Sequence, residues 1–403
     1  MPDRIRELRA LIGTTANKTY VAASNAAWAA GTAYVLPITA IDVSKLVHQG
    51  IESKVLTRRM HEAPAAKEGL SASELPISIP LGMGSADTTA PFEATLLSAF
   101  FGGLASPTVK THVVAASPAP SATGWTSEAD HGLSPGMAVL VNGEVRRVAT
   151  CPTTTSLTLE MALSAAPAHD DVVVNSHTVY LDPTATQSYL DLLGIGYHAE
   201  DQFQCLRCMG PVKFSGLGAG EEPSMDLALT VPQWQEVPAA DRDQLEPSTA
   251  PNGSGQAPTS RALGGFFMGD WGSTTRAAVE SADWSIDPGL QFVYKADANY
   301  ENRMGACKRV GGKVSGSITV YIDLDYGLHA DFPATDKQML WQFGNTAQAC
   351  VAITIPRARL KSKPVRKSIN NCSGLGLEFW GAEPTVGSTP DNCYSSAFSA
   401  HWF

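Results

Sequence analysis

Charged side chains are scarce in this sequence. They make up 17 % of its 403 residues, whereas a soluble domain usually carries about 25 %. Acidic residues outnumber basic ones by 39 to 29, which gives a formal net charge of -10. Proteins that grip nucleic acid generally present a basic face to the phosphates. The composition therefore argues against tight nucleic-acid binding, although it permits a protein that encloses DNA and lets it slide.

Long apolar runs are also missing. No stretch approaches the roughly 18 residues needed to cross a bilayer, and the opening MPDRIRELRA is charged and helix-like, without the apolar centre of an export signal. The seven cysteines are odd in number and widely scattered, which is typical of reduced thiols. We expect a protein made in the cytoplasm that does not associate with a membrane.

Catalytic and metal-binding motifs are absent as well. The sequence has no GxSxG, GxxxxGK[ST] or HExxH pattern. Its one CxxC pair, Cys205 and Cys208, lies in the alternating stretch FQCLRCMGPVKFSG, where residues three apart should point to opposite faces of a strand. GLGAG at 216–220 lies between two expected strands, and DLDYGLHADF lacks the spacing of a calcium loop. We predict no enzyme activity, no catalytic residue, no metal site and no cofactor.

What the sequence does contain is an internal repeat, offset by about 244 residues. Leu70 falls on Val314, and Leu96 falls on Leu340. Both copies predict the order strand, strand, polar loop, strand, helix, strand, strand. The helices are expected in PFEATLLSAFFG, which carries an apolar stripe and ends in two glycines, and in TDKQMLWQFGN. One helix cannot cover both faces of such sheets, so we predict a mainly β protein with two tandem antiparallel β-sandwich or barrel domains, each with a flanking helix.

Composition divides the chain into five segments. Between the two parts of the first repeat, the short alternating runs MAVLV, VRRVA, SLTLE and DVVVN predict a small all-β insertion, with a tight hairpin at Asn142 and Gly143. A stretch rich in Pro, Ser and Gly without periodicity predicts a linker. The predicted segments are an N-terminal arm (1–30), the first domain (31–105 and 178–235), the insertion (106–177), the linker (236–261) and the second domain with a C-terminal segment (262–403).

The repeats resemble a known family. The stretch from ITAIDVSKLV through LSASELPISIPL to APFEATLLSAFFGG is similar to the tail tube (major tail) proteins of long-tailed bacteriophages, and so are SADWSIDPGLQF, GKVSGSITVYIDLDY, CVAITIPRARL and SGLGLEFWGAE. The matching pieces cover more than half of the chain. The resemblance implies a structural virion protein of the phage tail, made in the host cytoplasm, which polymerises into stacked rings around a channel for DNA.

The same resemblance implies partners and contact residues. Six tube domains close a ring, so two domains on one chain imply a trimer with pseudo-sixfold symmetry, or alternatively a hexamer. Further partners would be the tape measure protein and other tail proteins, while DNA would pass through an acidic lumen without specific binding. Rings would stack through two long polar loops, 57–69 and 298–312. The candidate inter-ring contacts are Arg58, Arg59, His61, Glu62, Lys67, Tyr300, Glu301, Arg303, Lys308 and Arg309.

Two alternatives stay open at this point. The chain could be another tail component, such as a baseplate or tail terminator protein. It could instead be a carbohydrate-binding adhesive β-sandwich protein, which would need exposed aromatic side chains. Seven tryptophans are available for such a site: Trp125, Trp234, Trp271, Trp284, Trp341, Trp380 and Trp402.

Overall fold

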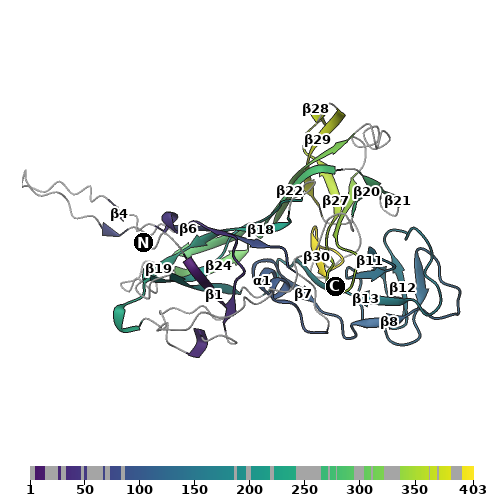
Figure 1. Cartoon of the computed structure of the whole chain (residues 1–403), viewed down its shortest axis with the longest axis horizontal. Helices are drawn as coiled ribbons and strands as arrows, with labels where there is room; N and C mark the ends of the chain where they lie inside the picture. Colours follow the sequence, from purple (N-terminus) through teal and green to yellow (C-terminus); the bar gives the residue numbers. More distant parts are fainter. Residues whose placement is uncertain are drawn as a thin grey trace, which may run out of the picture.

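The computed structural model describes residues 5–13, 26–28, 33–46, 50–51, 67–68, 73–82, 87–185, 188–196, 201–217, 222–241, 265–270, 273–277, 279–294, 304–309, 312–321, 336–362, 364–369, 372–382 and 393–403. Within these ranges the protein is mainly β, as predicted, with antiparallel pairing between its strands. The molecule is elongated, and its single described α-helix lies near the middle (Figure 1).

The first repeat consists of two strand groups and a two-stranded ribbon. One group is a five-stranded sheet in the order β19-β16-β15-β1-β2, the other is the order β3-β6-β18-β17, and the ribbon is β4-β5. The bounds are β1 (Ile5–Gly13), β2 (Tyr34–Val35), β3 (Ala40–Ile41), β4 (Gly50–Ile51), β5 (Lys67–Glu68), β6 (Ser73–Pro80), β15 (Tyr189–Gly196), β16 (Gln202–Cys208), β17 (Val212–Ser215), β18 (Ser224–Val231) and β19 (Gln233–Glu236).

The second repeat pairs its strands in the same pattern. Its groups are β30-β27-β26-β20-β21 and β22-β25-β29-β28, with the ribbon β23-β24. Taken in chain order, every strand pair of the first repeat recurs between the counterpart strands from β20 to β30, while β27 and β30 also pair with β29 and β14. The bounds are β20 (Gly265–Asp270), β21 (Ser273–Ala277), β22 (Val279–Asp287), β23 (Leu290–Tyr294), β24 (Met304–Arg309), β25 (Lys313–Tyr321), β26 (Lys337–Phe343), β27 (Val351–Leu360), β28 (Val365–Ile369), β29 (Cys372–Gly381) and β30 (Ser399–Trp402).

The prediction of a helical N-terminal arm is wrong for the part that the structure describes. Residues 5–13 form β1, which pairs with β15 along its length and with β2. The sequence looked helical because charged residues occupy the strand. Glu7 and Arg9 are nevertheless buried, and they form an ion pair of 2.5 Å beneath Trp28, whose carbonyl accepts from Arg9. Trp28 belongs to a 3-10 turn, η1 (Ala26–Trp28); the other such turns are η2 (Val43–Lys45) and η3 (Ala239–Asp241).

Only one of the two predicted flanking helices is found among the described residues. The helix α1 (Phe92–Phe101) buries its whole apolar stripe, and Gly102 ends it with a φ of 93°. The second prediction is wrong, because TDKQMLWQFGN contains the strand β26, all of whose residues are buried. A strand that is covered on both faces loses the alternation by which strands are recognised.

One hydrophobic core extends through both repeats. In the second repeat Trp284 meets Trp341 and Phe379 edge to face, each with ring centroids 6.1 Å apart. Phe398, in the C-terminal segment, packs against Phe101 of α1 and Phe214 of β17. Because the C-terminal segment lies against α1 and the first repeat, the two repeats are packed as one body.

The insertion forms a six-stranded antiparallel sheet of its own, and the predicted strands in it are confirmed. Two paired strands, β7 (Gly102–Ala105) and β14 (His177–Leu181), lead into and out of it. The hairpin at Asn142 and Gly143 has φ values of 51° and 79°, as a tight turn of this sequence requires. In sheet order the strands are β8 (Thr111–Val113), β13 (Val172–Asn175), β10 (Ala138–Val141), β11 (Glu144–Thr150), β12 (Ser156–Leu159) and β9 (Gly124–Thr126).

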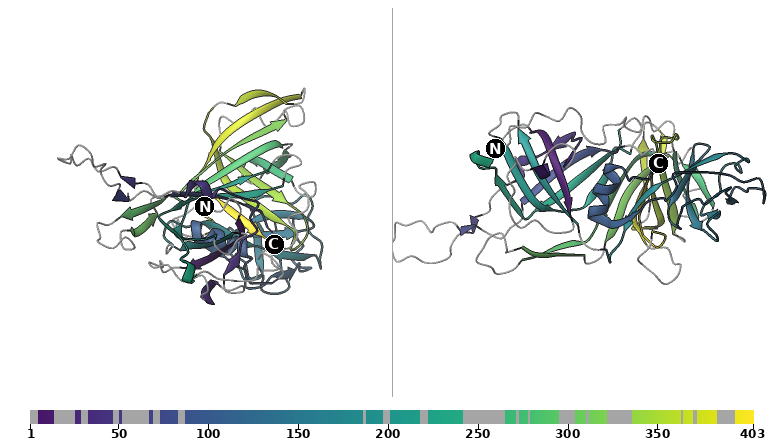
Figure 2. Two further views of the ribbon diagram at one scale, coloured as in Figure 1. Left: turned by 60° about the vertical axis from the view of Figure 1, so that its left-hand side comes forward. Right: turned by 90° about the horizontal axis from the view of Figure 1, so that it is seen from below.

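The insertion sheet occupies one end of the molecule and is packed against the second repeat (Figures 1 and 2). Leu140 and Val145 share a hydrophobic cluster with Leu340, Ala352 and Phe403. The side chain of Gln342 in β26 also accepts from the Val145 amide and donates to the Gly143 carbonyl, at 3.0 and 2.7 Å. The insertion therefore supplies the second covered face of β26.

A buried arginine completes this contact. The guanidinium of Arg147, in β11, donates to Glu160 at 2.5 Å and to the carbonyls of Cys393 and Tyr394 at 2.8 and 2.9 Å. The other oxygen of Glu160 accepts from Gln338 of β26 at 2.7 Å. Arg147 and Glu160 thus connect the insertion both to β26 and to the C-terminal segment.

Candidate functional site

The two repeats are joined edge to edge. Strand β17, at one side of the first repeat, pairs antiparallel with β22, at one side of the second, with Lys213 opposite Ser285. This junction merges β3-β6-β18-β17 and β22-β25-β29-β28 into one run of strands within the largest sheet. The run therefore ends at β28 on one side and at β3 on the other.

Those ends are open. Among the described residues β28 pairs only with β29, and β3 pairs only with β6. By position in the repeats, β28 is the counterpart of β17 and β3 is the counterpart of β22. The unpaired edges thus belong to the two strand types that already pair with each other inside the chain. β28 carries exposed Arg366 and Lys367, whereas β3 is followed by Asp42.

The face of this run that points away from the core is polar and contains many serines. One cross-strand row reads Ser78, Asp226, Lys213, Ser285, Ser315 and Trp380. Ion pairs of 3.2 and 3.6 Å join Lys213 to Asp283 and Lys361 to Glu378 on the same face. The described part of this face is therefore not uniformly acidic, since its carboxylates are accompanied by cations.

The two predicted contact loops correspond to the two ribbons. Seven of the ten candidate contact residues lie outside the described residues: Arg58, Arg59, His61, Glu62, Tyr300, Glu301 and Arg303. Lys67 lies in β5 opposite Ile51, while Lys308 and Arg309 lie in β24 opposite Gln291 and Leu290. The second loop is thus shorter than predicted, because residues 304–309 form a strand. Lys67 therefore lies on one ribbon, and Lys308 and Arg309 lie on the other.

Aromatic side chains do not form an exposed platform in the described part of the chain. Trp125, Trp234, Trp284, Trp341 and Trp402 are buried, and Trp271 lies outside the described residues. Of the described members of the predicted set, Trp380 alone is exposed, at 52 %. Carbohydrate sites built on stacked aromatic rings need several such side chains side by side.

The prediction that Cys205 and Cys208 point to opposite faces is wrong. Arg207 adopts a φ of 60°, and the register of β16 against β15 shifts between Cys205 and Cys208. This bulge turns both thiols into the same hydrophobic core, where burial, with the neighbouring Cys205 thiol adding to it, raises the pKa of the Cys208 thiol. Both thiols are buried among the apolar side chains of this core.

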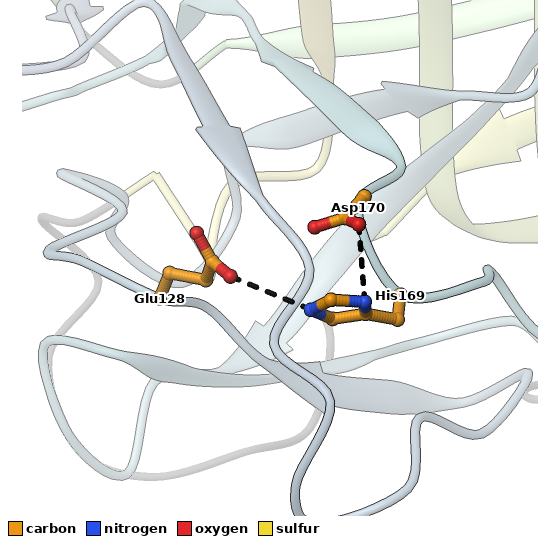
Figure 3. A group of neighbouring side chains, drawn as sticks. All are labelled: Glu128, His169 and Asp170. Atoms are coloured by element: carbon orange, nitrogen blue, oxygen red, sulfur yellow. Dashed lines mark ion pairs between the residues drawn. The ribbon is translucent and has the colours of Figure 1, made fainter.

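One group of side chains has ligand chemistry that the sequence patterns did not reveal. Glu128 and His169–Asp170 come from two different loops of the insertion and meet at its surface (Figure 3). The Nε2 atom of His169 lies 3.5 Å from the Glu128 carboxylate, and its Nδ1 atom lies 3.1 Å from the Asp170 carboxylate. The 40 residues between Glu128 and His169 conceal the group from any short motif, and no spacing rule could have found it.

The other predicted features stay close to their expectation where they are described. Gly216 has a φ of 66° in the turn between β17 and β18, so GLGAG starts as a hairpin connection rather than a phosphate loop. The acidic loop with Asp323, Asp325 and Asp331 lies outside the described residues. No helix in the described part of the chain combines the length and apolar character of a membrane span.

Comparison with protein-family models gives no match, and comparison with curated proteins gives no significant match.

Proposed function

We propose that this chain is the structural subunit of a hollow tail tube of a long-tailed bacteriophage. In this proposal the subunits polymerise into stacked rings, and DNA moves through the lumen during delivery to the host. The support is architectural: a duplicated β topology, edge-to-edge joining of the two copies, and open edges of the matching types. Neither catalysis nor a cofactor is part of the proposed role.

The pairing of β17 with β22 is the observation that carries the proposal. Within one chain this pairing sets the second repeat beside the first. If β28 of one subunit pairs with β3 of the next, the same relation is repeated between subunits. Such a contact uses two different surfaces, so it is heterologous, and it forms a ring where its repeated rotation closes on itself. Closure also removes the exposed edges that otherwise invite uncontrolled pairing.

The number of subunits follows from the duplication. A ring of six repeats needs three chains, which gives a trimer with pseudo-sixfold symmetry; six chains with twelve repeats is the alternative. The serine-rich face with paired charges would then line the lumen, where small polar groups offer little for a phosphate backbone to hold. The exposed positions of Arg366 and Lys367 opposite Asp42 of a neighbour would add charge complementarity to the new strand pair.

Proline substitutions in β28 test this assembly. Successive backbone N–H groups of a strand point in opposite directions. One of the two variants, Arg366→Pro and Lys367→Pro, therefore removes a backbone hydrogen bond to β29, and the other removes an N–H donor of the open edge. We expect the open-edge variant to keep the wild-type melting temperature and circular dichroism but to lose ring or tube formation in negative-stain electron microscopy.

The two variants control each other, because only the one that loosens the β28–β29 pair should lower the melting temperature. End views of wild-type assemblies, averaged by rotation, should show three insertions around the ring for a trimer and six for a hexamer. Wild-type chains that stay monomeric at every concentration would argue against the tube. Tubes that form equally well with both proline variants would instead reject the proposed edge.

A further inference from the structure

The space between His169 and Glu128 has the dimensions of a metal site. The Nε2 to carboxylate separation of 3.5 Å exceeds a normal hydrogen bond. Ligands bound to one tetrahedral zinc ion at about 2.0–2.1 Å lie about 3.3 Å from each other. By contrast, the 3.1 Å between Nδ1 and Asp170 is a hydrogen-bond distance. The two ring nitrogens therefore have different geometries toward their carboxylate neighbours.

The chemistry of the imidazole ring makes this difference meaningful. A neutral imidazole that donates Nδ1–H to Asp170 presents the lone pair of Nε2 to the Glu128 carboxylate. Two acceptors that face each other are held together by a hydrogen-bond donor or a cation between them, and a metal ion is one such cation. An outer carboxylate that holds Nδ1–H is also the usual support of a metal-binding histidine, because it fixes the tautomer and makes the ligand more basic.

The backbone holds both loops in place against the same strand. The amide of Glu128 donates to the carbonyl of Val113 at 3.0 Å, and the amide of Asp170 donates to the carbonyl of Val114 at 3.1 Å. The turn that carries His169 is closed by the Asp171 carboxylate, which accepts from the Ala168 amide at 2.8 Å. Binding would thus need only small side-chain movements, which the exposure of all three residues permits.

We propose that His169 and Glu128 bind a divalent cation of intermediate softness, with Zn²⁺ as the best fit, and that Asp170 is the outer-shell partner of His169. Imidazole together with carboxylate suits Zn²⁺, Co²⁺ or Ni²⁺ better than Ca²⁺ or Mg²⁺, which take oxygen ligands. The side chains are about half exposed (48 % for His169 and 52 % for Glu128), so water completes the coordination. Such an ion ties the β9–β10 connection to the β12–β13 connection. The site was not expected from the sequence, and it does not depend on the tube proposal.

Zinc titration of the full chain by calorimetry tests the site. Because histidines elsewhere in the chain can also bind zinc, the readout is the difference between the wild type and single variants. We expect His169→Ala and Glu128→Gln each to abolish one binding event. Asp170→Asn should keep that event but weaken it by about 10-fold or more, as loss of an outer-shell carboxylate does. Co²⁺ should give a d–d absorption band that His169→Ala removes.

Asp130→Asn is the matched control. Asp130 is an exposed carboxylate in the same connection as Glu128, but its oxygen accepts from the Gly132 amide and it is not part of the group. This variant should bind zinc as the wild type does. Equal stoichiometry and affinity in the wild type and His169→Ala would overturn the site. Retention of the cobalt band in Glu128→Gln would overturn the assignment of Glu128 as a ligand.

Discussion

Arg147→Ala should destabilise the folded chain by about 3–5 kcal/mol, the cost of breaking a buried ion pair. The side chain of Arg147 is fully buried, and its departure leaves the Glu160 carboxylate in the interior with Gln338 as its remaining donor. The carbonyls of Cys393 and Tyr394 lose a donor at the same time. Chemical unfolding followed by tryptophan fluorescence measures the loss, and Trp125 of the insertion lies within the affected region.

A second substitution separates the charge from the packing. Glu160→Gln in the Arg147→Met background removes the orphaned carboxylate and keeps an apolar side chain in place of the guanidinium, so the double variant should be more stable than Arg147→Ala. Lys213→Ala is the matched control, since the Lys213–Asp283 pair is half exposed and should contribute less than about 1 kcal/mol. A loss below 1 kcal/mol for Arg147→Ala would mean that the insertion is held by its apolar contacts and the Gln342 hydrogen bonds rather than by this ion pair.

The duplication was only partly predictable from the sequence. The offset of about 244 residues was wrong, because it set Leu96 of α1 on Leu340 of β26, whereas β26 corresponds by its pairing to β15. The alternation was recognisable because the central strands are covered on one face only. In β6 the buried residues Leu75, Ile77 and Ile79 alternate with partly exposed ones. The strand β25 preserves part of the same alternation, with Val314 and Ile318 facing the core. One-sided burial produces a period of two, and a period of two is what sequence reading detects best.

Strands with two covered faces were misread as helices. In β26 the insertion covers Gln338 and Gln342, while the core buries Trp341. In β1 the segment with Trp28 covers Arg9. Polar residues at buried positions are explained only by partners far away in the sequence, such as Glu160 for Gln338. Local pattern therefore could not distinguish these strands from amphipathic helices.

The candidate sites depended even more on distant contacts. The bulge at Arg207 that reverses the expected directions of Cys205 and Cys208 has no signal in the residue types around it. The group of Glu128, His169 and Asp170 exists only because Val113, at the end of β8, and Val114, the next residue, hold two separate loops side by side. The matching open edges of β28 and β3 likewise follow from the pairing of β17 with β22, which joins strands about 70 residues apart.

A buried carboxylic acid in α1 gives the chain a second vulnerable point. Glu93 lies in the first turn of the helix and is 1 % exposed, and its Oε1 atom has no hydrogen-bond partner. Gly82 packs against this carboxyl so closely that a Cβ at position 82 would overlap it. Removal from water raises the pKa of Glu93 from 4.5 to about 7. The group is therefore protonated in the folded chain at pH values where the unfolded chain has already ionised it.

Stability should accordingly fall as the pH rises from 4.5 to 7. Below 4.5 the carboxyl is neutral in both states, and above 7 the folded chain carries a buried charge whose total cost is about 3 kcal/mol by linkage. Glu93→Gln removes this pH dependence, so the stability of the variant relative to the wild type should increase by about 1.4 kcal/mol between pH 6 and pH 8.

Comparing the two proteins at each pH cancels the opposite contribution of His112, because burial lowers the pKa of His112 to about 4 in both. The exposed Glu74 provides the control, because Glu74→Gln makes the same chemical change at a side chain that is not buried by folding. If the stability difference between Glu93→Gln and the wild type is the same at pH 6 and pH 8, the carboxyl is not held protonated by the fold, and the cost of its burial must be offset by a contact formed only when it is charged.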